Sequence, residues 1–186
     1  MVMTKDVLFS LTKGGYAPQE EMLEVARKKG KLYIGIPKEI AFQENRVPLV
    51  PDAVALLVNN GHKIVVEAGA GSNAHFEDTD YSEAGAEIVY STDEVYKADI
   101  VLKIAPPTLE EIESMKTKQT LFSALQLTVQ PEDFLKKLVA KKLNCVAFDL
   151  ITDDAGIFPV IRAMGEIAGG ASISIAAELL SNVNNG

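Results

Sequence analysis

Short apolar runs rich in β-branched residues recur along this chain, and helical signals fill the intervals between them. The clearest runs are KIVVE at 63–67, IVLKI at 100–104 and CVAFDL at 145–150. Strands that are apolar almost throughout are typical of a sheet covered by helices on both faces. Alternation of such strands with helices indicates parallel strands joined by right-handed crossovers. The sequence therefore predicts an α/β fold with a doubly wound, mostly parallel sheet.

The same signals divide the chain into an N-terminal arm, residues 1–30, and one domain, residues 31–186. With 186 residues, 47% of them hydrophobic, the chain can bury one proper core. The arm is predicted to hold one helix at 18–29, and the domain is predicted to be Rossmann-like or flavodoxin-like. The expected strands are 32–36, 63–67, 86–90, 99–103, 120–125 and 144–150, and the expected helices are 51–60, 80–85, 92–97, 108–115, 131–142 and 162–182.

A charged loop follows the first predicted strand and contains Lys38, Glu39, Glu44 and Arg46. Open α/β sheets build their ligand sites at the carboxyl ends of their strands. Arg46 is the leading candidate for binding because its planar guanidinium can hold a carboxylate or phosphate through two parallel hydrogen bonds. The alternative interpretation is that these residues are solvated loop charges.

Lys103 lies near the carboxyl end of another predicted strand, where it can face the same crevice as Arg46. Together the two cations would hold a carboxylate. The stretch from Gly69 to Ala74 has the spelling of a dinucleotide-binding turn, but a polar loop follows where a helix is required. We therefore interpret its glycines as a tight turn, and we expect no cofactor-binding or metal-binding residues in this chain.

Composition narrows the classes of partner. The net charge is −8 with the basic residues scattered, so the chain lacks the basic stripe that nucleic acid requires. The single cysteine, Cys145, cannot form an intramolecular disulfide and is interpreted as a small core residue. No apolar run approaching the length of a bilayer and no signal segment stand out, so we expect a cytoplasmic protein without direct membrane insertion.

Several motifs resemble the N-terminal, substrate-side domain of the alanine dehydrogenase and pyridine nucleotide transhydrogenase family. They are P-K-E at 37–39, E-N-R-V at 44–47, P-D-A-V at 51–54, GHKIVVEAGAG at 61–71, DYSEAGAEIV at 80–89, ADIVLK at 98–103, TLFSALQ at 120–126 and MGEIAG at 164–169. The resemblance implies that Arg46 binds a carboxylate, helped by Lys103. It also implies that Gln126 occupies the position of the catalytic histidine and that Met164 lies beside the substrate.

Two positions depart from the alanine dehydrogenase pattern. Ala105 stands where those enzymes carry a second, substrate-binding lysine, and Gln126 stands where they carry the histidine. Glutamine can donate and accept hydrogen bonds but cannot titrate. Transhydrogenases also lack the second lysine, whereas MGEIAG and the turn before it look more like alanine dehydrogenase.

Three functions follow from the resemblance. The first is part of an NAD(P)-dependent oxidoreductase that interconverts L-alanine with pyruvate and ammonia, and the second is part of a transhydrogenase alpha subunit. The third is a non-catalytic binding or assembly module. NAD or NADP would be bound mainly by a domain following residue 186, so this chain alone is not expected to be active. The complete protein is expected to be a homo-oligomer.

The last predicted helix carries apolar residues at helical spacing, which predicts one buried stripe. Its members are Met164, Ile167, Ala168, Ala171, Ile175 and Leu179. Gly165, Gly169 and Gly170 interrupt the helix, and each costs about 1 kcal/mol relative to alanine. We interpret them as sites where another backbone or a ligand approaches closely.

Overall fold

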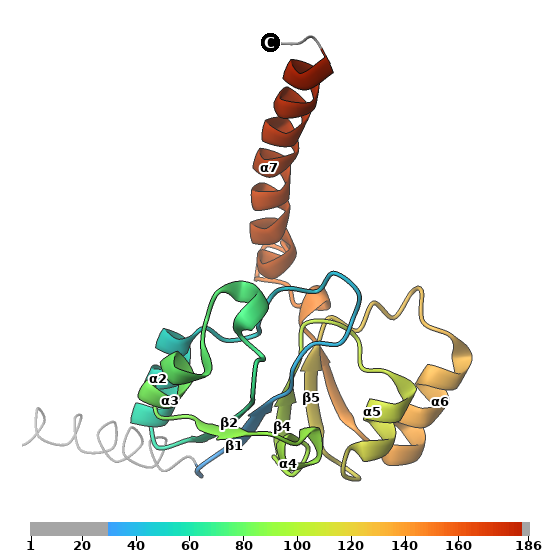
Figure 1. The fold of residues 1–186 in the computed structure, drawn as a ribbon. Helices are drawn as coiled ribbons and strands as arrows, with labels where there is room; N and C mark the ends of the chain where they lie inside the picture. The colour runs from blue at the N-terminus through green and yellow to red at the C-terminus, as the bar shows by residue number, and fades with distance from the viewer. Residues whose placement is uncertain (1–29, 184–186) are drawn as a thin grey trace, which may run out of the picture. The chain divides into compact units, whose positions relative to one another are not determined.

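The computed structural model describes residues 30–183, and the account below concerns the unit that begins at Leu32. The arm predicted at 1–30, with its helix, lies outside the described residues apart from Gly30. Within the unit, six strands form one parallel sheet in the order β3-β2-β1-β4-β5-β6 (Figure 1). The strands are β1 (Tyr33–Ile36), β2 (Lys63–Glu67), β3 (Glu87–Val89), β4 (Ile100–Leu102), β5 (Thr120–Ser123) and β6 (Asn144–Ala147).

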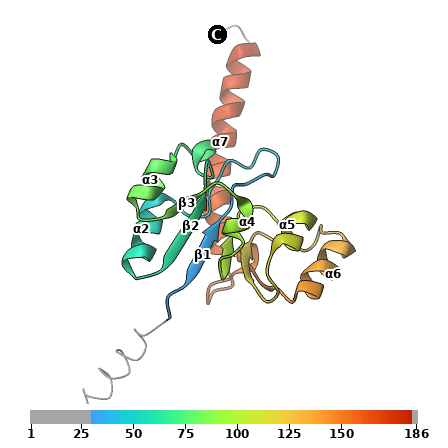
Figure 2. The ribbon, with the colours of Figure 1, turned by 60° about the horizontal axis from the view of Figure 1, so that its bottom comes forward.

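Helices connect the strands, as the alternation in the sequence predicts. They are α2 (Pro51–Asn59), α3 (Asp78–Glu83), α4 (Thr92–Val95), α5 (Leu109–Ser114), α6 (Glu132–Lys141) and α7 (Pro159–Val183), with short 3-10 helices η1 (Ser72–Ala74) and η2 (Phe148–Leu150). In Figures 1 and 2, α2 lies beside α3 and α5 lies beside α6. Pro51 occupies the first turn of α2, where a missing N–H removes no helical hydrogen bond.

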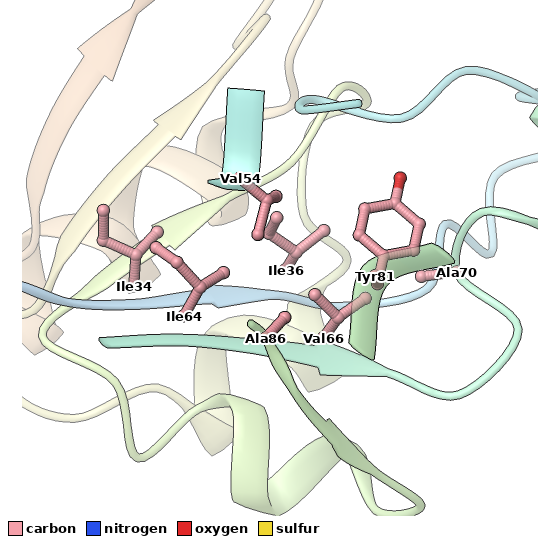
Figure 3. Packing of buried hydrophobic residues seen from close by; sticks show 8 residues of the cluster. All are labelled: Ile34, Ile36, Val54, Ile64, Val66, Ala70, Tyr81 and Ala86. Carbon is pink, nitrogen blue, oxygen red and sulfur yellow. The ribbon is translucent and has the colours of Figure 1, made fainter. Parts of the chain in front are cut away.

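Helices pack on both faces of the sheet. One face presents Ile36, Ile64 and Val66 to Val54 of α2 and Tyr81 of α3, and Figure 3 shows these side chains packed together. On the opposite face, Val65 packs in a cluster with Val95 of α4, and Val101 and Leu121 pack with residues of α5 and α6. The doubly wound, Rossmann-like arrangement predicted from the sequence is therefore confirmed.

The strand predicted at 144–150 is shorter than expected. β6 pairs with β5 only as far as Ser123 opposite Ala147, and the next three residues form η2. The strand was predicted to reach Leu150 because the residues up to that position are mostly apolar. A strand also needs a neighbouring strand to which its backbone can hydrogen-bond. Since β5 itself ends at Ser123, the chain has no ladder to continue along and turns instead.

The buried stripe predicted for the last helix is wrong within the described chain. Ile167, Ile175 and Leu179 of α7 have exposed fractions of 65%, 56% and 61%. Among the described elements, η2 is the one that α7 contacts closely, so no described helix or strand covers the stripe. Likewise, a Cβ built at Gly165 or Gly169 would meet no atom within 4 Å, so the predicted close approach is not found.

The expectation that no apolar run approaches the length of a bilayer is wrong for α7. By length and composition alone, the segment Pro159–Ser181, with a mean hydropathy of 1.2, meets the criteria for a membrane-spanning helix. Core helices of proteins that never enter a bilayer meet the same criteria, so the finding carries no further conclusion.

Candidate functional site

In this parallel sheet there is one pair of neighbouring strands whose onward connections lead to opposite edges of the sheet. β1 and β4 lie side by side, and the chain passes from β1 toward β2 and β3 but from β4 toward β5 and β6. Crevices at such a switch point, at the carboxyl ends of the strands, are where open α/β sheets bind ligands. Here the crevice is bordered by the loop after β1, residues 37–50, and the loop after β4, residues 103–108.

Lys103 forms the charged centre of this crevice. Its side chain is only 1% exposed, and its Nζ lies 2.7 Å from Glu111 Oε1 and 3.2 Å from Glu39 Oε2. Burial of an ammonium group is costly unless it is paired and hydrogen-bonded, and two carboxylates meet that requirement here. The Lys103 charge is therefore engaged within the protein itself.

Glu111 is held in place by the start of α5. It occupies the third helical position of a capping box, in which its Oε2 accepts from the Thr108 N–H at 2.7 Å and its own N–H donates to Thr108 Oγ1. The hydroxyl of Tyr96 donates to Glu111 Oε1 at 3.0 Å. Burial, together with the charge of Glu111, raises the pKa of Tyr96, so this hydroxyl stays protonated and acts as a donor.

Glu39 connects the two loops. Its Oε1 accepts from the Ile104 N–H at 2.5 Å, while Oε2 faces Lys103 without hydrogen-bond geometry toward any described residue. The side chain of Glu39 is 5% exposed. Because one ammonium is shared by two buried carboxylates, the cluster Glu39–Lys103–Glu111 has a formal charge of −1.

Arg46 lies at the edge of the same crevice but in a different environment. Its side chain is 53% exposed, and its Nε and Nη2 donate to Glu44 at 2.8 and 2.6 Å. This bidentate hydrogen bonding lowers the pKa of Glu44 and raises the pKa of Arg46. The negative charge of Glu39 also raises the pKa of Arg46. Arg46 and Lys103 thus lie in the two loops that border the crevice, and each cation is engaged by a carboxylate of the protein itself.

Gln126 and Met164 take no part in this cluster of contacts. Gln126 is exposed, adopts a left-handed φ of 48°, and its backbone N–H donates to Asp149 Oδ2 at 3.1 Å. Met164 lies on α7 with 36% of its surface exposed. Neither residue lines the pocket described next, and no described contact joins either of them to Arg46 or Lys103.

A pocket of about 290 Å³ opens beside the cluster. Its walls come from the loop before α2, the end of β4, β5, η2 and the start of α7. The lining residues are Pro48, Leu49, Leu102, Lys103, Ile104, Phe122, Phe148 and Val160. Lys103 is thus the single charged residue of this wall.

The glycine turn after β2 behaves as predicted. Gly69 has a positive φ of 74°, and a Cβ on Gly71 would lie 2.6 Å from the Tyr81 ring and 2.7 Å from the Phe76 carbonyl. Gly71 therefore packs against protein, and the helix that follows is the three-residue η1. A dinucleotide site needs a cradle open to the pyrophosphate and a helix beginning there. Residues 30–183 do not fit a nicotinamide cofactor at this turn, and they contain no cluster of His, Cys, Asp or Glu suited to a metal.

Sequence reasoning missed Tyr96 and Glu111. The signal for Glu111 was present, because T-x-x-E at 108–111 before an apolar residue is the spelling of a capping box. What the spelling does not indicate is that the same carboxylate also reaches Lys103. Tyr96 carried no local signal beyond its aromatic character.

The strand order and the cluster at the switch point define the class of protein: an open, doubly wound α/β domain with its candidate ligand site between β1 and β4. A model of the alanine dehydrogenase/PNT N-terminal domain matches residues 35–168. Alanine dehydrogenase from Staphylococcus saprophyticus is 39% identical over 155 residues, which are 83% of this chain and 42% of that protein. Alanine dehydrogenase 2 from Staphylococcus aureus is 39% identical over 153 residues, 82% of this chain and 41% of that protein.

Solved structures agree with the sequence matches. An L-alanine dehydrogenase superposes with a TM-score of 0.77 at 34% identity, covering 80% of this chain and 41% of that one. A transhydrogenase from Sinorhizobium meliloti superposes with a TM-score of 0.60 at 27% identity, covering 63% and 35% of the two chains. The chain therefore belongs to the alanine dehydrogenase/pyridine nucleotide transhydrogenase family and corresponds to its N-terminal domain. It spans less than half the length of these relatives.

Proposed function

We propose that this chain is the substrate-side domain of an NAD(P)-dependent oxidoreductase of the alanine dehydrogenase type. The observation that carries the proposal is the meeting of the Arg46 loop with Lys103 at the switch point of a family domain whose relatives are named alanine dehydrogenases. The substrate is a small 2-amino or 2-oxo carboxylate, such as L-alanine or pyruvate.

Arg46 is the proposed carboxylate ligand. Its guanidinium already has bidentate geometry with Glu44, and a substrate carboxylate would take the place of that side chain. Because Arg46 is half exposed, this exchange requires no opening of the core. Lys103 contributes by fixing Glu39 and Glu111, and through them the two loops that border the site.

Gln126 and Met164 are proposed to border the substrate in the complete protein. Gln126 can hold a water molecule or a substrate carbonyl by hydrogen bonds, but proton transfer needs a titratable group elsewhere. The nicotinamide cofactor supplies hydride transfer, and we propose that it binds to a separate nucleotide-binding domain. A cytoplasmic homo-oligomer is the proposed state of the complete protein.

The first test measures binding to the 186-residue chain by isothermal titration with pyruvate. Arg46→Ala is expected to weaken binding roughly 10- to 100-fold, because a hydrogen bond to a charged group contributes about 1.5–3 kcal/mol. Lys136→Ala is the matched control, since Lys136 is also exposed and paired with a glutamate, Glu132, but lies on α6. Equal affinity in the Arg46 and Lys136 variants would remove Arg46 as the carboxylate ligand.

The second test measures the reaction in the complete protein. Given NAD and L-alanine, it is expected to form NADH and to release ammonia in equal amounts. NADH formation with no ammonia would contradict oxidative deamination of alanine. Formation of neither product would contradict the dehydrogenase assignment and leave a transhydrogenase domain or a binding or assembly module of the same fold.

A transhydrogenase domain is the second candidate, favoured by the replacements at Ala105 and Gln126 and by the superposed transhydrogenase structure. This function processes no amino acid and passes hydride between two bound nucleotides. It predicts that the complete protein reduces an oxidised nucleotide analogue from NADH while L-alanine has no effect.

A further inference from the structure

The loop after β1 is fixed near its two ends. At its start, the Lys38 N–H donates to Glu67 Oε2 at 2.8 Å. At its end, the hydroxyl of Tyr81 donates to the Leu49 carbonyl at 2.9 Å. In the part of the chain that the structure describes, the hydrogen bonds and ion pairs of residues 40–48 all stay within that segment. The middle of the loop is therefore held by its own contacts.

Glu44 makes all of these contacts. Its Oε1 accepts from the Arg46 backbone N–H at 3.1 Å and from Nε at 2.8 Å, and its Oε2 accepts from Nη2 at 2.6 Å. Its own N–H donates to the Ala41 carbonyl at 3.1 Å and closes a turn. Only 12% of the Glu44 side chain is exposed, and a carboxylate so far removed from water is costly to leave unpaired. The pairing of Arg46 and the conformation of the loop are thus coupled.

The carboxylate of Glu44 has the same chemistry as the ligand proposed for Arg46. Each offers two oxygens to the Nε and Nη2 donors, so the two cannot hold this edge of the guanidinium at the same time. The charge of Glu39 also acts on Arg46, but that carboxylate is engaged by Lys103 and by the Ile104 N–H. Glu44 is therefore the carboxylate that has to leave when a ligand arrives.

We infer that Glu44 is a built-in competitor that lowers the affinity of Arg46 for carboxylate ligands, and that its release rearranges residues 40–48. The inference rests on the proposed function, since it takes a ligand carboxylate to bind at Arg46. A site that is occupied by its own chain binds ligand with an affinity reduced to the fraction of molecules in which it is free. Once released, Glu44 has lost its partner and moves toward water together with the turn that its N–H closes.

Glu44→Gln tests the competition. The amide keeps the size of the side chain but carries no charge and has a single acceptor oxygen, so it holds Arg46 more weakly. Isothermal titration of the 186-residue chain with pyruvate is expected to show an affinity raised by about three- to tenfold, which corresponds to Glu44 occupying Arg46 in about two thirds to nine tenths of the molecules. Glu132→Gln, which removes the same charge from an exposed pair with Lys136 on α6, is the control and should leave the affinity unchanged.

A fluorescent reporter tests the rearrangement of the loop. The chain contains no tryptophan, so Phe42→Trp introduces a single one. Phe42 is 91% exposed and lies within the turn that the Glu44 N–H closes. Pyruvate is expected to change the emission of this variant saturably, with the dissociation constant that calorimetry gives for the same variant. Tyr90→Trp, at a position that is 88% exposed just after β3, is the control and should not respond.

Combining the two substitutions separates competition from a general effect of charge. Loss of a negative charge by itself also attracts an anion, but it does not rearrange the loop before a ligand is added. In the chain that carries both Phe42→Trp and Glu44→Gln, the emission without ligand is expected to lie close to that of the pyruvate-saturated Phe42→Trp chain. Circular dichroism and the unfolding midpoint establish that each variant is folded like the parent chain.

The outcomes distinguish the inference from the proposed function. If the parent chain binds pyruvate and Glu44→Gln binds it no more tightly, Glu44 is not a competitor, although Arg46 remains a carboxylate site. An emission of Phe42→Trp that saturating pyruvate leaves unchanged would equally overturn the inference. Absence of pyruvate binding in both the parent and the Glu44→Gln chain would contradict the proposed function as well. Tighter binding in Glu44→Gln, together with a saturable response of the reporter, supports the inference.

Discussion

Lys103 and Arg46 carry the same charge and lie in the loops that follow two neighbouring strands, but they differ in how far they are removed from water. Lys103 is 1% exposed and Arg46 is 53% exposed. In a medium of low dielectric constant the attraction between charges is stronger, but so is the cost of leaving one unpaired. The buried cation is therefore committed to its two carboxylates, whereas the exposed one can exchange its partner.

Replacing Lys103 tests how much its charge stabilises the fold by balancing the two buried carboxylates. Lys103→Met is expected to destabilise the chain by about 3–5 kcal/mol, because Glu39 and Glu111 would remain buried without a counter-charge. Lys136→Met is the control, since Lys136 is 64% exposed in an i,i+4 pair and should cost no more than about 0.5 kcal/mol. Urea unfolding followed by circular dichroism measures both. Equal losses would mean that the cluster is not desolvated in solution.

The Arg46–Glu44 pair is expected to make the stability of the fold depend on pH. Its hydrogen bonds lower the pKa of Glu44 below the ordinary value of 4.5, so the pair stabilises the fold fully above that pH. The stabilisation is lost as the pH falls through the lowered pKa, and because Arg46 is half exposed it amounts to about 0–1 kcal/mol. In Arg46→Ala the pKa of Glu44 is expected to rise toward 4.5, as measured by NMR titration of the side-chain carboxyl. An unchanged pKa would show that the bidentate pair does not persist in solution.

At the scale of the elements, local sequence patterns correctly predicted the helices and strands whose ends are set by interactions over a few residues. The strand Lys63–Glu67 and the helix beginning at Pro51 were predicted within a residue, because apolar periodicity and proline geometry act over a few positions. The end of β6 was not, since it depends on the length of β5. The contact between Glu39 and Ile104 spans 65 residues and has no local signature.

Two glycines show how the surroundings of an element decide the effect of the same substitution. In β1, a Cβ at Gly35 would lie 2.6 Å from the Val95 carbonyl of the helix α4, so Gly35→Ala is expected to cost about 1–3 kcal/mol. In α7, a Cβ at Gly169 meets nothing within 4 Å, so Gly169→Ala should favour the helix by up to about 1 kcal/mol. Urea unfolding measures the first, and the helical signal in circular dichroism measures the second. A neutral Gly35→Ala would mean that α4 does not pack closely on β1.

At the scale of the whole described unit, the apolar residues fall into a buried group and an exposed group. Those of the sheet and of α2 to α6 form the clusters on the two faces, whereas those of α7 are exposed along the helix. Helical spacing of apolar residues indicates that a helix has an apolar face, but it does not indicate what covers that face. For this reason the sequence predicted the stripe correctly as a pattern and wrongly as a buried surface.

The uncovered stripe of α7 predicts how the chain behaves in solution. Contiguous exposed apolar surface binds hydrophobic dyes and promotes association, so the 186-residue chain is expected to enhance ANS fluorescence. A shortened chain ending at Phe158 should lose most of that enhancement, while its unfolding free energy stays within about 1 kcal/mol, because α7 contributes little burial to the sheet. Fluorescence titration and urea unfolding of the two chains, matched in concentration, measure both quantities. If the shortened chain bound as much dye, the apolar surface would lie on the sheet unit itself; if it lost its cooperative unfolding, α7 would be part of the core after all.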